Sequence, residues 1–236
     1  MNDENIEFIR ILSAFSFIIP LVFWVRDTTI SPLQNHIIGA LIVVAGVSDL
    51  LSYLRIANPQ ALYNIYNVVQ LGLITWFYYE LVYKKRSEFI VLISTGVYIL
   101  ILLVSVLKYG WPANYTLLWS TGSLIITIHS VTYAVNVQSM TIDRYFDKNL
   151  LSNVILSSSL FCYFITTFII FFLSDTIFKE HNLETVKAFW TLHNVFNILK
   201  NIGLAVGFYY TGKRKIYMTM EQLERIARKM EEEGNP

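Results

Sequence analysis

The sequence predicts an all-α polytopic membrane protein, built as a bundle of seven transmembrane helices. Hydrophobic residues make up 55% of the chain and charged residues only 15%, whereas an ordinary soluble domain is about 25% charged. Seven long apolar stretches follow one another, each close to the roughly 20 residues that cross a hydrocarbon core. Backbone amides inside a bilayer must bond within their own segment, so runs of this length indicate helices.

The transmembrane domain is expected over residues 1–212, followed by a tail over 213–236. Pro20 should kink the first helix, because it removes a backbone donor and frees the carbonyl of Ser16. The acidic stretch Asn2-Asp3-Glu4-Asn5 predicts a retained first helix rather than a cleaved signal peptide. In chain order, the predicted spans are 6–25, 35–56, 62–83, 89–109, 115–137, 153–177 and 188–210.

The distribution of positive charge predicts the orientation of the bundle. With the N-terminus outside, 12 of the 18 Lys and Arg residues fall in inner segments and 4 in outer segments. Cytoplasmic loops retain positive residues, so we expect a multi-pass protein of the plasma or inner membrane, with its N-terminus outside and its C-terminus inside. The basic residues read as topology signals in a chain of net charge +1, and no nucleic-acid partner is predicted.

Cysteine and histidine usage argues against several chemistries. The chain has one cysteine, Cys162, which excludes an internal disulfide and a thiolate metal cluster. Its histidines lack zinc-ligand spacing, and no Gly-x-Ser-x-Gly nucleophile motif occurs. We therefore predict no catalytic residues, no metal and no enzymatic activity. The four histidines are His36, His129, His181 and His193.

The last predicted span carries a polar sector that should avoid lipid. At 100° per residue, its polar residues fall within about 120° of the helix surface. Lys200 lies near mid-depth, where an unpaired ammonium costs at least ~3 kcal/mol. Asp49 is the only acidic residue placed well inside a span, so an Asp49–Lys200 pair is expected, either as a structural ion pair or as part of a ligand or ion site. The sector contains His193, Asn194, Asn197, Lys200 and Asn201.

Other spans add polar and small residues that suit contact between helices. Asn64, Asn67 and Gln70 recur at i, i+3 and i+6, a pattern typical of interhelical hydrogen bonding. His129 lies opposite a face of serines and threonines, and Gly203 and Gly207 form a step that favours close packing. The candidate ligand- or ion-binding residues are Asp49, Lys200, Asn197, Asn201, His193, Asn67, Gln70 and His129.

The tail predicts a short amphipathic helix over residues 219–231. A capping box begins at Thr219, and the basic residues 213–215 are expected to end the last span at the inner surface. A helix of this length is too short to be stable alone, so it needs a membrane surface, a second subunit or a cytoplasmic signalling protein. The predicted docking residues are Met220, Leu223, Ile226 and Met230.

A lysine halfway along a seventh helix also invites comparison with microbial rhodopsins, whose equivalent lysine binds retinal. That family has an aspartate four residues before the lysine, where this chain has Phe196, and carboxylates where it has Asn64, Asn67 and Gln70. No cofactor is therefore predicted, and retinal on Lys200 is a minor alternative.

Two segments carry a closer resemblance: Tyr63-Asn64-Ile65-Tyr66 leading into Trp76-Phe77-Tyr78-Tyr79, and Phe189-Trp190 followed by Asn197 and Asn201. The chain resembles uncharacterised bacterial seven-helix membrane proteins, some associated with sensory signalling. The resemblance implies a seven-helix fold and a sensor-like role. Together with the polar sector and the amphipathic tail, it leads to the first hypothesis, a receptor or sensor module with a polar intramembrane site and a docking tail. A small transporter or ion channel, with Lys200, Asp49 and His129 along its path, is the second hypothesis, and a retinal photoreceptor is the third.

Overall fold

The computed structural model describes residues 3–26, 32–53, 59–82, 84–110, 116–139, 149–179 and 183–233, and the regular elements among them are all helices. Side chains are not described beyond Thr211. The all-α prediction is confirmed for the described chain. The helices are α1 (Asp3–Phe15), α2 (Ile18–Arg26), α3 (Leu33–Tyr53), α4 (Pro59–Leu81), α5 (Lys85–Tyr109), α6 (Thr116–Gln138), α8 (Leu150–Lys179) and α9 (Leu183–Glu233).

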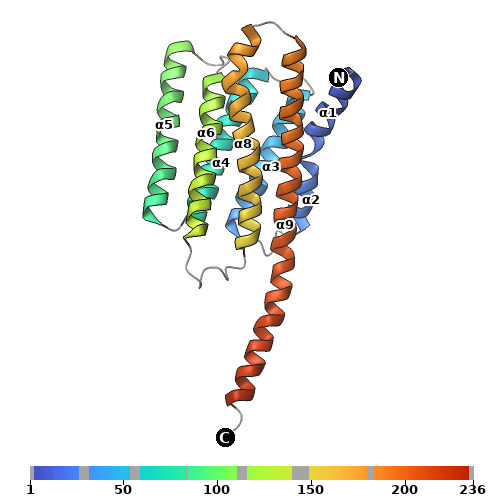
Figure 1. The fold of residues 1–236 in the computed structure, drawn as a ribbon, viewed down its shortest axis with the longest axis vertical. Coiled ribbons are helices and arrows are strands. Elements are labelled where there is room, and N and C mark those ends of the chain that lie inside the picture. Colours follow the sequence, from blue (N-terminus) through green and yellow to red (C-terminus); the bar gives the residue numbers. More distant parts are fainter. Residues whose placement is uncertain are drawn as a thin grey trace.

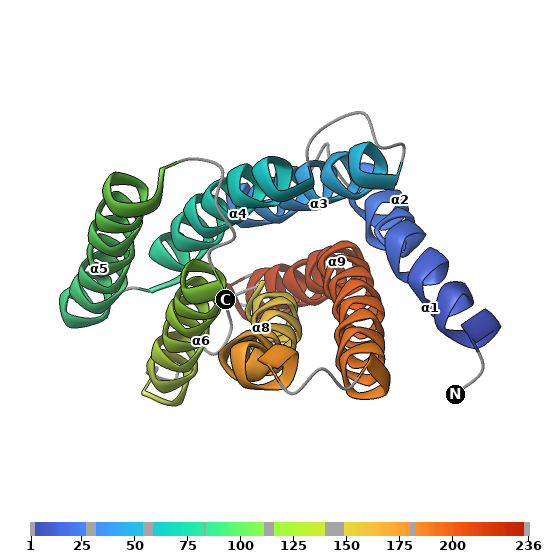
Figure 2. The ribbon, with the colours of Figure 1, turned by 90° about the horizontal axis from the view of Figure 1, so that it is seen from above.

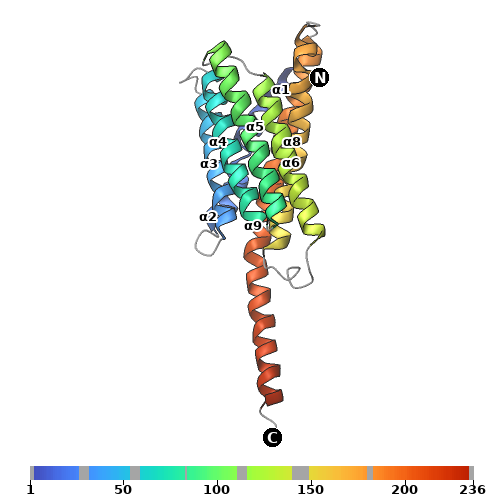
Figure 3. The same ribbon diagram turned by 90° about the vertical axis from the view of Figure 1, so that its left-hand side faces the viewer.

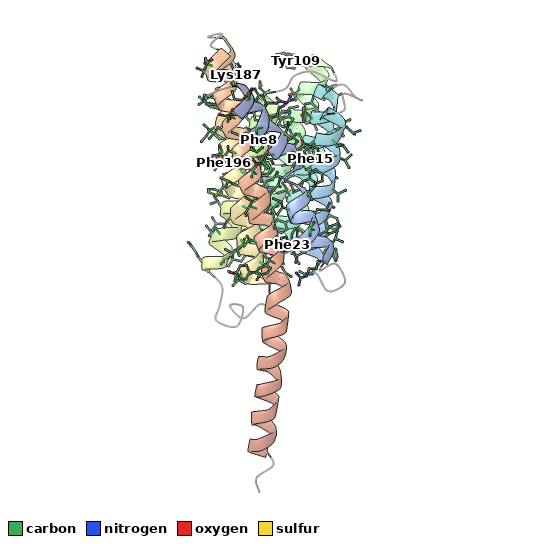
Figure 4. All side chains as sticks on the ribbon, turned by 90° about the vertical axis from the view of Figure 1, so that its right-hand side faces the viewer. Phe8, Phe15, Phe23, Tyr109, Lys187 and Phe196 are labelled. Carbon is green, nitrogen blue, oxygen red and sulfur yellow. The ribbon has the colours of Figure 1, made fainter. Side chains whose placement is uncertain are left out.

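Four helical segments are long and apolar enough to cross a membrane: Glu4–Arg26, Leu33–Leu51, Lys85–Tyr109 and Leu150–Ser174. Large apolar side chains such as Phe8 and Phe15 are exposed on the outside of α1 (Figure 4). Water does not favour so much exposed apolar surface, whereas lipid does. The structure therefore supports association with a membrane through several helices.

The helices close into a ring when viewed along the bundle axis (Figure 2). Helix α9 packs along α8, α8 along α6, α6 against α4, and α4 along α3. The rod formed by α1 and α2 contacts both α3 and α9 and completes the ring, while α5 packs outside against α6 and α4. The side chains of α3 and α4 therefore face those of α8 and α9.

The rod formed by α1 and α2, which we call the first rod, is interrupted close to Pro20, where the sequence predicts a kink. Helix α1 ends at Phe15, and α2 begins at Ile18, two residues before Pro20. The Ser16 carbonyl, which loses its partner four residues on, accepts instead from Ile19 N at 3.2 Å. The break leaves Ser13 and Ser16 buried against the rest of the bundle.

Close packing between α8 and α9 depends on two glycines. A Cβ added at Gly203 would lie 2.9 Å from Ser159 Cβ, and one added at Gly207 would lie 2.6 Å from Leu156 Cδ2. Both separations are shorter than carbon contacts allow. The expected small-residue contact is therefore confirmed, with α8 as the neighbour.

Helix α9 does not end at the basic residues 213–215, and this expectation was wrong. It continues unbroken to Glu233 and projects beyond the rest of the bundle, at the end opposite the N-terminus (Figure 1). Lys and Arg are good helix formers, so a cluster of them can stop insertion into lipid without ending a helix. Residues 219–231 are thus the continuation of α9 rather than a separate short helix.

Candidate functional site

Lys200 of α9 lies inside the bundle, as expected, with 7% of its surface exposed. Its Nζ sits 4.3 Å from the ring centre of Tyr163 on α8. No described side chain accepts a hydrogen bond from Nζ, and no described carboxylate forms an ion pair with it. An ammonium has three hydrogen-bond donors. The aromatic ring stabilises the charge of Lys200 but leaves these donors without a described acceptor.

Asp49 approaches the same region from α3. It interacts electrostatically with Lys200, without the direct ion pair that was expected. The side chain is half-buried, and its carboxylate accepts no hydrogen bond from the described residues. Two opposite charges thus act on each other across the interior, and each still has unused hydrogen-bonding capacity.

Two tyrosines complete a cluster that we name the polar junction: Asp49, Tyr66, Tyr163 and Lys200. Both tyrosines lie near Asp49, and Tyr66 lies near Tyr163. Gln70 donates to the Tyr66 hydroxyl at 2.7 Å, so this candidate residue orients a junction side chain. The four members come from α3, α4, α8 and α9.

His193 borders the polar junction, about two helical turns before Lys200. Its Nε2 lies 3.4 Å from the Tyr163 hydroxyl. The imidazole ring also stands nearly perpendicular to Trp190, at 5.8 Å between ring centres, and contacts Phe171 at 6.1 Å. Its Nδ1 is buried with no described partner. The junction is thus closed on this side by aromatic rings.

Asn197 and Asn201 lie on another side of α9 and bond to the first rod. Asn197 Nδ2 donates to Ser13 Oγ at 3.0 Å, and Asn201 Nδ2 donates to Ser16 Oγ at 2.6 Å. The Ser16 hydroxyl in turn donates to the Ser13 carbonyl at 2.7 Å. These two candidates therefore join helices, and their described hydrogen bonds do not involve the polar junction.

His129 and Asn67 lie on the opposite side of the molecule, next to α5. His129 is fully buried, with Nε2 2.9 Å from Ser94 Oγ. Asn67 Nδ2 donates to the Tyr98 hydroxyl at 3.2 Å. Both side chains link α5 to the ring, as expected of polar residues between helices.

A further polar cluster, which sequence reasoning missed, lies where α9 leaves the bundle. Thr211 accepts from Asn35 Nδ2 of α3 at 3.1 Å and shares a hydrogen bond of 2.5 Å with Ser152 of α8. Ser152 Oγ also donates to the Gly207 carbonyl at 2.8 Å. We name Asn35, Ser152 and Thr211 the exit cluster, because three helices meet in it at the start of the projecting part of α9.

Sequence reasoning also missed the role of Tyr66 and Tyr163. A signal was available: both tyrosines lie well inside their helices, away from the headgroup level where aromatic belts form. A phenol at that depth needs a partner for its hydroxyl. The predicted docking residues of the tail lie outside the described side chains.

The described residues offer no group of three His, Cys, Asp or Glu side chains that could hold a metal ion. Comparison with protein-family models, with curated proteins and with solved structures finds no match. The arrangement itself therefore carries the functional argument. It brings together a buried lysine, a nearby carboxylate and two phenols in the interior of the bundle.

Proposed function

We propose that this protein is a seven-crossing membrane receptor, with its N-terminus outside, in which a ligand, lipid or ion acts at the polar junction and α9 transmits the response to the inner side. The observation that carries the proposal is the path of α9. This one helix holds Lys200 in the interior and then projects beyond the bundle to Glu233 (Figure 3).

The energetics of Lys200 support binding over a purely structural role. A charge at mid-depth costs at least ~3 kcal/mol, and a desolvated cation–π contact returns about 2 kcal/mol. A ligand that completes the coordination of Lys200 would offset the remaining cost. A molecule with acceptors for Lys200 and donors for Asp49 would satisfy both groups at once.

The contacts of α9 favour transmission along its length. Between Lys200 and Thr211 the helix is held to α8 by the two glycines and to α3 by the exit cluster. It contains no proline and no break over this stretch. If α9 is displaced near Lys200, its projecting part therefore moves with it as one rigid helix. No flexible loop lies between them to absorb the movement.

A small transporter or channel is the second candidate, because polar side chains occur on α9 at three depths, at His193, Lys200 and Thr211. Each of them contacts a neighbouring helix rather than a described opening. Flux separates the two functions. A transporter reconstituted in liposomes would pass protons, Na⁺, K⁺ or a small solute at a rate that Lys200→Met changes, whereas a receptor would pass none of them.

The receptor proposal is tested by measuring the position of the projecting helix. Spin labels at Gln138, on the inner end of α6, and at Gln222, on α9, report their separation in reconstituted protein with Cys162 replaced by serine. We expect Lys200→Met to shift the distance distribution, because it removes the buried charge through which Asp49 and Tyr163 act on α9.

The matched control is Lys108→Met. Lys108 also lies over an aromatic ring, that of Tyr109 at 5.0 Å, but it is exposed at the far end of α5. This control should leave the distance distribution unchanged. Identical distributions for the wild type and Lys200→Met would contradict transmission along α9.

A further inference from the structure

The projecting part of α9 carries an apolar repeat of a particular form. Ile216, Met220, Leu223, Ala227 and Met230 are separated alternately by four and three residues. This is the a/d spacing of a two-stranded coiled coil, in which each helix buries one stripe against its partner. Ile226, also predicted to dock, falls beside that stripe.

The same repeat continues backwards into the bundle. Over residues 191–209, every exposed side chain of α9 falls in the register of the projecting part, and the others are buried or half-buried. Leu199, for example, is 53% exposed, whereas its neighbour Lys200 is 7% exposed. The exposed residues are Leu192, Val195, Leu199, Ile202, Val206 and Tyr209.

These two stripes together form what we name the α9 seam, from Leu192 to Met230. At 1.5 Å per residue it is about 57 Å long. Lipid can cover the half that lies within the bundle. It cannot cover the other half, because α9 continues along the bundle axis and does not turn onto the membrane surface (Figures 1 and 3). No other described helix lies beside it there.

A partner that covers the whole α9 seam must therefore lie in the membrane along one half and in water along the other. A cytoplasmic protein would cover only the projecting half, whereas a second copy of this chain presents the same stripe at the same heights. Two copies inserted in the same direction place their α9 helices parallel. The interface is then isologous, with each residue near its own counterpart across a two-fold axis.

The charges along the projecting part agree with this arrangement. In the heptad register, Glu221, Arg225, Arg228 and Lys229 fall away from the seam. Glu224, which flanks it, is opposed across a parallel pair by the Thr219 position and so faces no like charge. Lys213 is the one charge in the seam, and it lies at the basic cluster, where a long side chain can extend into the headgroups.

We propose that two copies of this chain associate in parallel through the α9 seam. The inference rests on the proposed function, since it specifies the second subunit as the partner that the output helix engages. Association through the seam would also account for the unbroken course of α9. A continuous helix keeps the apolar repeat in one register from the membrane half to the projecting half.

Cysteine cross-linking of the full chain in liposomes tests the α9 seam. The native cysteine is first removed by Cys162→Ser. Single replacements Leu199→Cys, Leu223→Cys and Met230→Cys then lie in the seam, and Gln222→Cys and Arg225→Cys are matched positions outside it. We expect disulfide-linked dimers to form about ten-fold faster in the seam, because Cα atoms more than ~7 Å apart cannot be bridged.

Three results would overturn the proposal: equal rates at Leu223 and Arg225, cross-links only in the bundle half, or single-molecule photobleaching that counts one copy in unmodified protein. The experiment needs no ligand, and Lys200→Met should keep the same pattern. Seam-specific cross-links without the spin-label response would refute the receptor mechanism alone. The response without seam-specific cross-links would refute the dimer alone.

Discussion

Helix α9 meets the bundle on two sides that are built differently. Toward α8 it presents Gly203 and Gly207, whose missing side chains let Ser159 and Leu156 approach closely. Toward α1 and α2 it presents asparagines that bond to serines beside a helix break. The first side is fixed by steric fit, which has few alternatives. The second is held by a few exchangeable hydrogen bonds.

This difference indicates how α9 could move. Hydrogen bonds between membrane helices contribute about 0.6 kcal/mol each on average, whereas overpacking a close contact costs about 1–3 kcal/mol. We therefore expect α8 and α9 to behave as one unit, and the joint with the first rod to open first. Lys200 and Tyr163 lie within the rigid pair, and Asp49 lies across from it.

The largest predicted effect is on the α8 side. Gly203→Val should destabilise the protein by about 2–3 kcal/mol, because the new side chain overlaps Ser159. Thermal unfolding of purified protein in detergent measures this cost. Gly96→Val on α5 is the control, since nothing lies within 4 Å of a Cβ added there; it should leave the unfolding temperature nearly unchanged. Equal losses for both variants would contradict steric fixation.

A smaller effect is expected on the side of the first rod. Asn201→Val removes the bond to Ser16 and should cost about 0.6–1.7 kcal/mol in the same unfolding assay. Asn194→Val changes a half-buried asparagine of the same helix for which no hydrogen bond is described, and should cost less. If Asn201→Val lowered the free energy of unfolding more than Gly203→Val does, the first rod and not α8 would be the fixed neighbour of α9.

The smallest effect concerns the break itself. Pro20→Ala restores a donor for the Ser16 carbonyl and should straighten the first rod, which moves Ser16 away from Asn201. The two substitutions should then be non-additive: Asn201→Val costs less in the Pro20→Ala background, by at least about 0.5 kcal/mol. Strict additivity in a double-mutant cycle would show that the kink does not position these serines.

Local features of the sequence predicted much of the fold. Composition and periodicity indicated a helical membrane-associated bundle, and Pro20 indicated the break in the first rod. The glycine step indicated a close contact. Each of these follows from residues within one helix, whose relative positions are fixed by helical geometry.

The partners across helices were harder to predict. Sequence placed Asn197, Asn201 and Lys200 in one polar sector, but the structure divides that sector between the first rod and α8. Which helices adjoin, and how each is rotated, depends on packing over the whole bundle. For the same reason, the tyrosine beneath Lys200 and the exit cluster could not be identified from spacing alone.

The most direct test of the central claim is the thermal stability of Lys200→Met, with Lys108→Met as the control. If Lys200 serves to bind a ligand, its burial without a described ion pair is a cost to the stability of the bundle. Methionine should therefore raise the stability by about 1 kcal/mol, the difference between burying the charge and the cation–π contact. A structural ion pair with Asp49 predicts the opposite, a loss of about 3–5 kcal/mol, and such a loss would contradict the account.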